Sequence, residues 1–255
     1  MPLKIQYCSD LHLEFRENRE FLKANPLKTE GDILLLAGDI LPFAEMNKHD
    51  AFLNEISDKF ETVYWIPGNH EYYYFDAAKR SGSFNEKIRS NLFLVNNCAF
   101  LQNDVRFIFS TLWSKISPAY EWQIERGMSD FHVIKYNGSR FSTSKFNQLH
   151  NESRDFIEHE ITKDHAGKTI VVTHHSPTFM NYPEKYKGDV LSEAFAVELF
   201  DFIEPSNIDY WIYGHHHTNT RDFNIGNTKM LTNQLGYVKY DENSAFDNSK
   251  KIIIY

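Results

Sequence analysis

Side chains that could bind metal ions are concentrated in five short segments of this sequence, residues 10–12, 38–39, 68–71, 174–176 and 214–217. Each segment offers an aspartate, an asparagine or a histidine. Together they hold seven of the 12 histidines of the chain, namely His12, His70, His174, His175, His215, His216 and His217. Carboxylate, amide and imidazole ligands without a thiolate suit borderline divalent ions such as Mn, Fe, Zn, Co or Ni. The residue types therefore indicate a metal site.

The number of candidate donors favours two ions over one. A single catalytic ion takes about three protein ligands and keeps one position open for water or substrate. Two ions that share a bridging carboxylate use the donors more fully. When such ions lie about 3.5–4 Å apart, they stabilise the attacking and leaving oxygens of a phosphoryl transfer and supply hydroxide near neutral pH. The pattern is thus typical of metal-dependent phosphoester hydrolysis.

Each segment alone also has a structural interpretation. An aspartate such as Asp10 often follows the end of a strand, and Asn69 and His70 could cap a following helix. The histidine triplet at 215–217 is harder to explain this way, because three adjacent imidazoles at the end of a core strand are costly to bury. A closed structural zinc site is disfavoured, since such sites prefer cysteine. The metal interpretation therefore depends on the five segments taken together.

The strands that must position these segments are recognisable from hydropathy. Near-continuous apolar runs of strand length lie at residues 3–8, 32–37, 63–66, 105–110, 169–173 and 209–213, and five of them end at a candidate segment. Continuous hydrophobicity predicts strands that are covered on both faces, as in α/β folds. Because ligands bind beyond the carboxyl ends of the strands in such sheets, we expect the five segments to converge.

Helices are expected between the strands, at residues 44–60, 76–90, 145–163 and 192–203. The first two alternate with strands, which favours parallel crossovers. Near the end of the chain, residues 222–225, 229–232 and 251–255 are typical of hairpin strands, and Gly226 and Asn227 join the first two. Neither a repeat nor a linker is recognisable, so we predict one domain over residues 1–255, with a mixed sheet or two packed sheets.

Residues 112–140 fit this scheme least well. They contain two tryptophans, Trp113 and Trp122, and several other aromatic residues without a clear period. A stretch that long without regular structure is typical of a lid or a binding loop. The alternative is a surface excursion that packs its own aromatic side chains.

Composition excludes several classes of protein. With 42% hydrophobic and 24% charged residues, the chain of 255 residues is neither disordered nor fibrous. A net charge of −8 disfavours nucleic acid or an anionic membrane as main partner, since proteins that bind them normally carry a basic face. The two cysteines, Cys8 and Cys98, favour free thiols in a reducing compartment. We find no signal peptide or membrane-spanning run, and expect a cytoplasmic protein.

In chain order, Asp10-x-His12, Gly38-Asp39, Gly68-Asn69-His70-Glu71, His174 and Gly214-His215-His216-His217 resemble the five-block signature of the calcineurin-like metallophosphoesterases. The blocks run from residue 10 to residue 217. The resemblance implies an α/β fold, a four-layer α/β/β/α sandwich of two mixed β-sheets flanked by helices. It also implies a dinuclear metal site at the strand ends and attack on the phosphoester by a metal-activated hydroxide.

The resemblance assigns roles to individual residues. One ion would be held by Asp10, His12 and His217, the other by Asn69, His174 and His215, and Asp39 would bridge them. His70 would not bind a metal, and would contact the phosphate or protonate the leaving oxygen. Asn69 would also contact substrate.

The residues alone leave two assignments open, the choice between His174 and His175 as ligand and the role of Tyr72. His174 is preferred to His175 as ligand because it directly follows the apolar run, which leaves His175 as a candidate for substrate contact. Tyr72 begins an aromatic run that could stack on a nucleobase. In the alternative, this run packs the next helix against the sheet.

Departures from the family pattern reduce the number of substrate classes that the resemblance allows. Gly38-Asp39 is followed by Ile40-Leu41-Pro42 in place of the Asp-Arg-Gly element of the protein Ser/Thr phosphatases, and the added domains of the related nucleases are absent. What remains is a small phosphoester, either a monoester or a diester, and a nucleotide-like one if the aromatic run stacks on a base. The competing interpretation is a non-catalytic protein-binding scaffold of the same fold, whose metal site is degenerate. The presence of every expected ligand favours the enzyme.

Overall fold

The computed structural model describes residues 2–255 and contains two six-stranded sheets. The first sheet has the strand order β14-β1-β2-β3-β5-β4. Its four central strands are parallel: β1 Leu3–Cys8, β2 Ile33–Ala37, β3 Thr62–Ile66 and β5 Leu92–Asn96. The edge strands are antiparallel to their neighbours: β14 Lys251–Ile254 and β4 Phe84–Lys87.

The second sheet has the same plan, with the strand order β12-β13-β11-β10-β7-β6. Its four central strands are parallel: β13 Thr228–Thr232, β11 Tyr210–Tyr213, β10 Lys168–Thr173 and β7 Val105–Ser110. The antiparallel edge strands are β12 Phe223–Ile225 and β6 Cys98–Gln102. Both sheets are therefore mixed.

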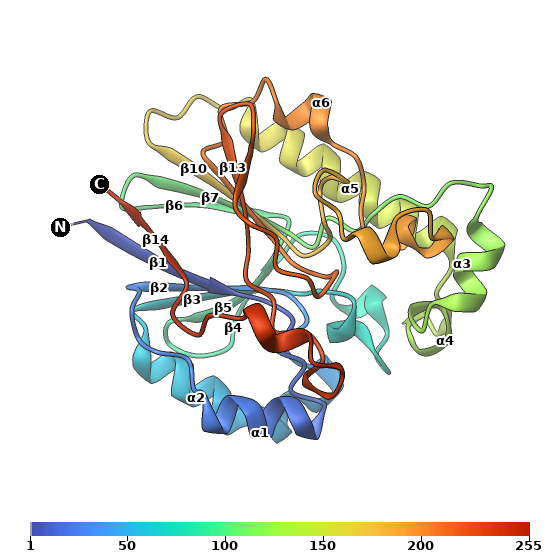
Figure 1. Cartoon of the computed structure of the whole chain (residues 1–255), viewed down its shortest axis with the longest axis horizontal. Helices are drawn as coiled ribbons and strands as arrows, with labels where there is room; N and C mark the ends of the chain where they lie inside the picture. The colour runs from blue at the N-terminus through green and yellow to red at the C-terminus, as the bar shows by residue number, and fades with distance from the viewer. Residues whose placement is uncertain (1) are drawn as a thin grey trace.

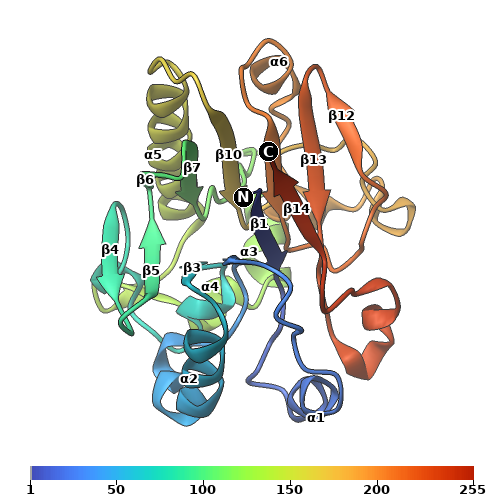
Figure 2. The ribbon, with the colours of Figure 1, turned by 90° about the vertical axis from the view of Figure 1, so that its left-hand side faces the viewer.

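Helices cover the outer face of each sheet (Figures 1 and 2). The helices α1 Arg16–Ala24 and α2 Asp50–Lys59 flank the first sheet, and α5 Thr143–Ile161 and α6 Phe200–Ile203 flank the second. Alternate residues of β2 point to different layers, since Leu35 joins the core between the sheets and Leu34 the core under α1 and α2. Burial on both faces explains why the central strands are largely apolar. The four-layer α/β/β/α sandwich is confirmed.

Several local predictions are wrong. Residues 76–90 form a short 3₁₀ turn, Ala77–Lys79, and then β4 in place of a helix, because pairing with β5 outweighs local propensity. Residues 192–203 form only α6 and the end of a 3₁₀ turn, Val190–Ala194. The strand predicted at 251–255 is β14, which pairs with β1 and forms no hairpin with its predecessor. The helix α1 and the strands β5 and β6 were not predicted.

Residues 112–140 have more regular structure than their sequence indicates. They contain α3 Glu121–Gly127, α4 Asp130–Val133 and a small ribbon formed by β8 Lys135–Tyr136 and β9 Ser139–Arg140. Their apolar side chains lie in the core cluster that also covers the outer face of the first sheet, among them Trp113, Ile116, Ile124, Phe131 and Ile134.

The carboxyl ends of the central strands lie at the end of the molecule opposite to both chain termini (Figure 1). The cysteines Cys8 and Cys98 are free thiols. Between residues 2 and 255, no helix is long and apolar enough to cross a membrane.

Candidate metal centre and pocket

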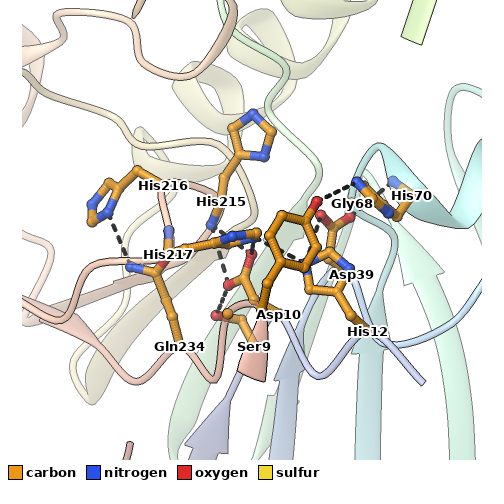
Figure 3. Close-up of polar contacts among 12 residues, drawn as sticks. Ser9, Asp10, His12, Asp39, Gly68, His70, His215, His216, His217 and Gln234 are labelled. Carbon is orange, nitrogen blue, oxygen red and sulfur yellow. Dashed lines mark hydrogen bonds and ion pairs between the residues drawn. The ribbon is translucent and has the colours of Figure 1, made fainter. Parts of the chain in front are cut away.

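Five loops bring the candidate residues to one place. Asp10 follows β1, Asp39 follows β2, Asn69 follows β3, His174 follows β10 and His215 follows β11. Both sheets present the carboxyl ends of these strands at the same edge, so loops distant in sequence meet. Figure 3 shows Asp10, His12, Asp39 and His217 directed toward a common centre.

The backbone turns sharply at this edge. Five candidate residues adopt positive φ, namely Asp10 (57°), His12 (47°), Asp39 (55°), His215 (80°) and His217 (51°). This left-handed region is unfavourable for residues with a Cβ. Backbone strain of this kind persists where the surrounding structure fixes it, as it often does at functional sites.

Two motif glycines leave room for the candidate ligands. A Cβ on Gly214 would lie 2.6 Å from Oδ2 of Asp10, and a Cβ on Gly68 would lie 2.6 Å from Nε2 of His174. Both distances are too short for carbon, so the two loops pack this closely only with glycine.

A first group of donors consists of Asp10, His12, Asp39 and His217, whose ligand atoms all lie within 4.8 Å of one another. Nε2 of His217 lies 3.4 Å from Oδ1 of Asp10, and Nε2 of His12 lies 3.7 Å from Oδ2 of Asp39. The two Nε2 atoms are themselves 2.9 Å apart.

A second group contains Asp39, His174 and His215, again with ligand atoms within 4.8 Å of one another. Nε2 of His174 lies 3.3 Å from Oδ1 of Asp39, 3.2 Å from Oδ1 of Asn69 and 3.0 Å from Nδ1 of His215. Asp39 thus presents Oδ2 to the first group and Oδ1 to the second, which is the arrangement of a bridging carboxylate.

In the first group, the outer nitrogen of each histidine is bound to a glutamate. Nδ1 of His12 donates to Oε1 of Glu14 at 3.2 Å, and Nδ1 of His217 donates to Oε2 of Glu242 at 2.8 Å. A carboxylate accepts hydrogen bonds and cannot donate them, so the proton of each neutral imidazole lies on the outer side. Pairs of this kind orient histidine ligands in metal sites.

In the second group, backbone carbonyls accept the hydrogen bond from the outer nitrogen of each histidine and so orient its ring. Nδ1 of His174 donates to the carbonyl oxygen of Ala37 at 2.9 Å, and Nε2 of His215 donates to that of Ala194 at 3.3 Å. All four imidazoles therefore direct a lone pair inward when neutral.

This donor set fits divalent cations. Two inner nitrogens at 2.9 Å or 3.0 Å repel one another unless a proton or a metal ion lies between them or beside them. Around them are buried carboxylates and an amide oxygen, and no thiolate, which matches the preferences of borderline divalent metals. The residues present can hold metal ions in two adjacent positions.

The electrostatics agree with this. Burial by itself raises the pKa of Asp39, but His174 and His70 outweigh it and hold that pKa well below its usual value. Burial lowers the pKa of His174, yet Asp39 raises it to about 9 overall. In His217, burial is likewise outweighed by Asp10 and Glu242, which raise the pKa to about 10. The site therefore attracts positive charge, and metal binding would displace protons from it.

His70 lies beside the donors without belonging to the two groups that share Asp39. Nδ1 of His70 donates to Oε1 of Glu14 at 2.8 Å, and Nε2 lies 3.2 Å from the hydroxyl of Tyr237. The ring of Tyr73 stacks on that of His70, with centroids 4.0 Å apart. Burial lowers the pKa of His70, but Asp39 and Glu14 outweigh it, so that the pKa is raised overall.

A pocket of about 230 Å³ opens onto the donors. One wall is formed by the candidate residues themselves, namely Asp39, Asn69, His70, His215, His216 and His217. The rest of the lining contains Met128 and Ser129 from the turn between α3 and α4, and also Tyr73, Tyr186, Phe195, Tyr237 and Glu242. The volume matches a small ligand.

Three residues singled out in the sequence lie outside the two groups of donors that share Asp39. Tyr72 is in the core with 1% of its surface exposed, and its hydroxyl donates to the carbonyl of Arg80. His175 is fully buried, with Nδ1 3.4 Å from the carbonyl of Thr111. His216 points away toward Gln234 (Figure 3). Of these three, only His216 borders the pocket.

Sequence reasoning missed the residues that orient the donors. Glu14 could have been found, because it continues the alternation of Asp10 and His12. Tyr237 and Glu242 lie in the irregular segment after β13. No motif or hydropathy pattern in the sequence marks them as site residues. Tyr73, and not its neighbour Tyr72, faces the pocket.

Comparisons with known proteins agree with this geometry. A family model described as calcineurin-like phosphoesterase matches residues 3–219. An uncharacterized protein of Acanthamoeba polyphaga mimivirus is 34% identical in an alignment of 259 positions that covers 91% of each chain.

Two solved structures share the fold. A phosphopantetheinyl hydrolase from Mycobacterium tuberculosis aligns with a TM-score of 0.69 and 15% identity, over 98% of this chain and 95% of the other. A dimetal phosphatase from Danio rerio aligns with a TM-score of 0.57 and 12% identity, over 100% and 99%. The chain belongs to the calcineurin-like phosphoesterases, a family of metal-dependent phosphoester hydrolases.

Proposed function

We propose that this protein is a dinuclear metal-dependent phosphoesterase that hydrolyses a small phosphoester. The observation that carries the proposal is the position of Asp39, whose two oxygens face two separate groups of inward-directed imidazoles. A single-ion site does not need a carboxylate between two sets of donors.

Each ion has a defined set of ligands in this proposal. Asp10, His12 and His217 would hold one ion, and Asn69, His174 and His215 would hold the other, with Asp39 shared. Two such ions would supply a nucleophile at neutral pH and neutralise the charge on the phosphoryl oxygens. Borderline metals, namely Mn, Fe, Zn, Co or Ni, suit the donors.

The role of His70 is to hold a proton at Nε2, the end of the ring on the pocket side. Because Nδ1 is bound to Glu14, only Nε2 is free to reach the substrate. The hydroxyl of Tyr237 occupies that side of the ring, 3.2 Å from Nε2, and a substrate oxygen would replace it as the partner of Nε2. His70 would protonate the leaving oxygen there or, at the least, position the phosphate.

The pocket favours a substrate with a compact group next to the phosphate. Its volume of about 230 Å³ and its aromatic walls suit a small organic group. A nucleotide-like substrate depends on Tyr186, Phe195 or Tyr237 for stacking, since Tyr72 lies in the core. One structural neighbour is named a phosphopantetheinyl hydrolase and the other a dimetal phosphatase, and both names are compatible with the proposed reaction class.

In the single domain that we propose for residues 1–255, residues 112–140 are an insertion that reaches the active site through one turn. Their core contacts support a fixed insertion, and only the turn at Gly127, Met128 and Ser129 reaches the pocket. In this position the turn would select among substrates.

The test is reconstitution of metal-free protein. Protein stripped with a chelator is loaded separately with Mn, Fe, Zn, Co or Ni, its metal content is measured, and its activity is assayed on aryl and alkyl phosphomonoesters and phosphodiesters. We expect about two ions per chain and an activity that depends on them. A protein-binding scaffold of the same fold would bind fewer ions or none and would hydrolyse none of these esters in any metal form.

A further inference from the structure

Glu14 is neither a proposed metal ligand nor the proposed acid, yet it touches both parts of the active site. It lies in the loop between β1 and α1, and its side chain is 14% exposed. A single oxygen, Oε1, accepts from Nδ1 of His12 at 3.2 Å and from Nδ1 of His70 at 2.8 Å. One carboxylate oxygen thus contacts a candidate metal ligand and the candidate acid.

The loop that carries Glu14 is fixed from its other side. Nη1 of Arg19, in α1, donates to the carbonyls of Leu13 and Glu14 at 2.6 Å and 2.9 Å. The ring of Phe15 packs against the ring of His12, with centroids 5.9 Å apart. The carboxylate is therefore presented from a rigid backbone and is not a mobile surface group.

Its contact with His70 sets the direction of the imidazole. Since a carboxylate only accepts hydrogen bonds, Nδ1 of His70 must carry a proton, and Nε2 is left for the substrate side. Tyr73 holds the face of the ring, and the hydroxyl of Tyr73 donates to Oδ2 of Asp130 at 3.0 Å. The imidazole of His70 is therefore held in its plane by the hydrogen bond to Glu14 and from above by the stacked ring of Tyr73.

The contact of Glu14 with His12 likewise sets the orientation of that imidazole, which is a candidate metal ligand. With Nδ1 of His12 donating to Glu14, Nε2 presents a lone pair toward Oδ2 of Asp39, 3.7 Å away. A ring flip would bring Nδ1 inward and lose the hydrogen bond. The other oxygen of Glu14, Oε2, is buried and has no hydrogen-bond partner among residues 2–255, so the contribution of this side chain lies in the two contacts of Oε1.

We infer that Glu14 is a positioning residue that fixes the tautomer and ring orientation of His12 and His70 together. A change at Glu14 therefore affects both metal retention and proton transfer, in contrast to a change at either histidine alone. The kinetic part of the test depends on the proposed function, and the spectroscopic part does not.

The spectroscopic test uses metal-free protein. A buried, hydrogen-bonded imidazole N–H gives a downfield proton resonance that can be assigned to Nδ1 by its ¹⁵N coupling. We expect such resonances from His12 and His70 in the wild type and their loss in Glu14→Leu. The control, Glu17→Leu, changes an exposed glutamate of the same region and should keep both. Unchanged resonances in Glu14→Leu would overturn the inference.

The kinetic test is a double-mutant cycle with metal content measured in every sample. Residues that orient metal ligands typically contribute about 10–100-fold to activity or metal affinity. On an alkyl phosphoester we expect a rate loss in this range for Glu14→Leu at full metal occupancy. In the His70→Ala background, adding Glu14→Leu should cost less than about twofold more, because the group that it positions is absent. Fully additive losses would contradict the inference.

A second variant covers the case in which Glu14→Leu fails to fold. Glu14→Gln keeps the size and one accepting oxygen but removes the charge, so it should shift the Nδ1–H resonances and lower the rate by more than threefold. If both stay at wild-type values, Glu14 does not position His70. If the wild-type protein hydrolyses no phosphoester in any metal form, the proposed function fails, and the resonances alone decide the role of Glu14.

Discussion

The carboxylate of Glu71 accepts a hydrogen bond of 2.9 Å from the backbone N–H of Asp39, the residue at the centre of the two metal groups. Glu71 also accepts from the N–H groups of Gly68 and Ile40 and from Nε1 of Trp65, at 2.7–2.9 Å. The side chain is completely buried. It ties together the loops after β2 and β3 and holds Asp39 in its left-handed conformation.

Glu71→Gln should therefore destabilise the protein. The new amide group would place donors against backbone N–H groups, and leaving buried donors unsatisfied costs about 1–3 kcal/mol each. We expect the free energy of unfolding to fall by about 3 kcal/mol, together with weaker metal binding. Urea unfolding measures the first effect. The exposed Glu61→Gln is the control, and an equal change in both variants would contradict this role.

Asp39→Asn should remove both ions, because each ion loses a charged ligand. Asp10→Asn is the matched variant, since Asp10 belongs to the first group only and should cost mainly one ion. Elemental analysis after dialysis gives the number of ions per chain. Retention of two ions by Asp39→Asn, together with wild-type rates, would show that Asp39 is not the bridge.

His70→Ala should keep its metals and lose activity selectively. A positioned acid contributes about 10²–10⁴-fold, and it matters most for a poor leaving group. We expect a large loss of kcat on alkyl phosphoesters and a much smaller loss on activated aryl esters. The exposed His132→Ala serves as control. An equal fractional loss on both esters at normal metal content would leave His70 only a role in binding phosphate.

The metal-free protein should lose stability as the pH rises. The pKa of His174 is raised from 6.5 to about 9 and that of His217 to about 10. A raised pKa stabilises the folded state below the unfolded pKa, and this contribution disappears as the pH passes the folded value. Stability should fall between pH 6.5 and about 10. Urea unfolding in chelator at pH 6, 8 and 10 measures this, and a rise over that range would contradict it.

Ser129→Trp should impair substrate binding. Ser129 is exposed and lines the pocket, so a large side chain there would narrow the entrance. We expect KM to rise severalfold with unchanged metal content. Ser139→Trp, in the exposed ribbon of the same segment, should keep the wild-type KM. If the two variants behave alike, the turn between α3 and α4 does not contact substrate.

The sequence by itself determined where the site must form. Asp10, Asp39 and His215 each follow a largely apolar run of strand length, and runs of that kind become buried parallel strands whose ends meet. This regularity, which depends only on hydropathy and order along the chain, also predicts strands that are covered on both faces, whereas the four-layer sandwich is what the resemblance to the phosphoesterase family implies. It did not predict β4, because an edge strand with mixed polarity is stabilised by its neighbour β5 and not by its own pattern.

Tertiary structure decided how each side chain is used. His174 and His175 are adjacent and chemically identical, and only packing directs Nε2 of His174 toward Asp39 while His175 lies near Thr111. Likewise, Glu14 and Glu242 are ordinary acidic residues in the sequence, and they orient His12 and His217 because distant loops place them 3.2 Å and 2.8 Å from the outer nitrogens. Hydrogen bonds depend on distance and direction in space, which hydropathy and spacing along the chain do not specify.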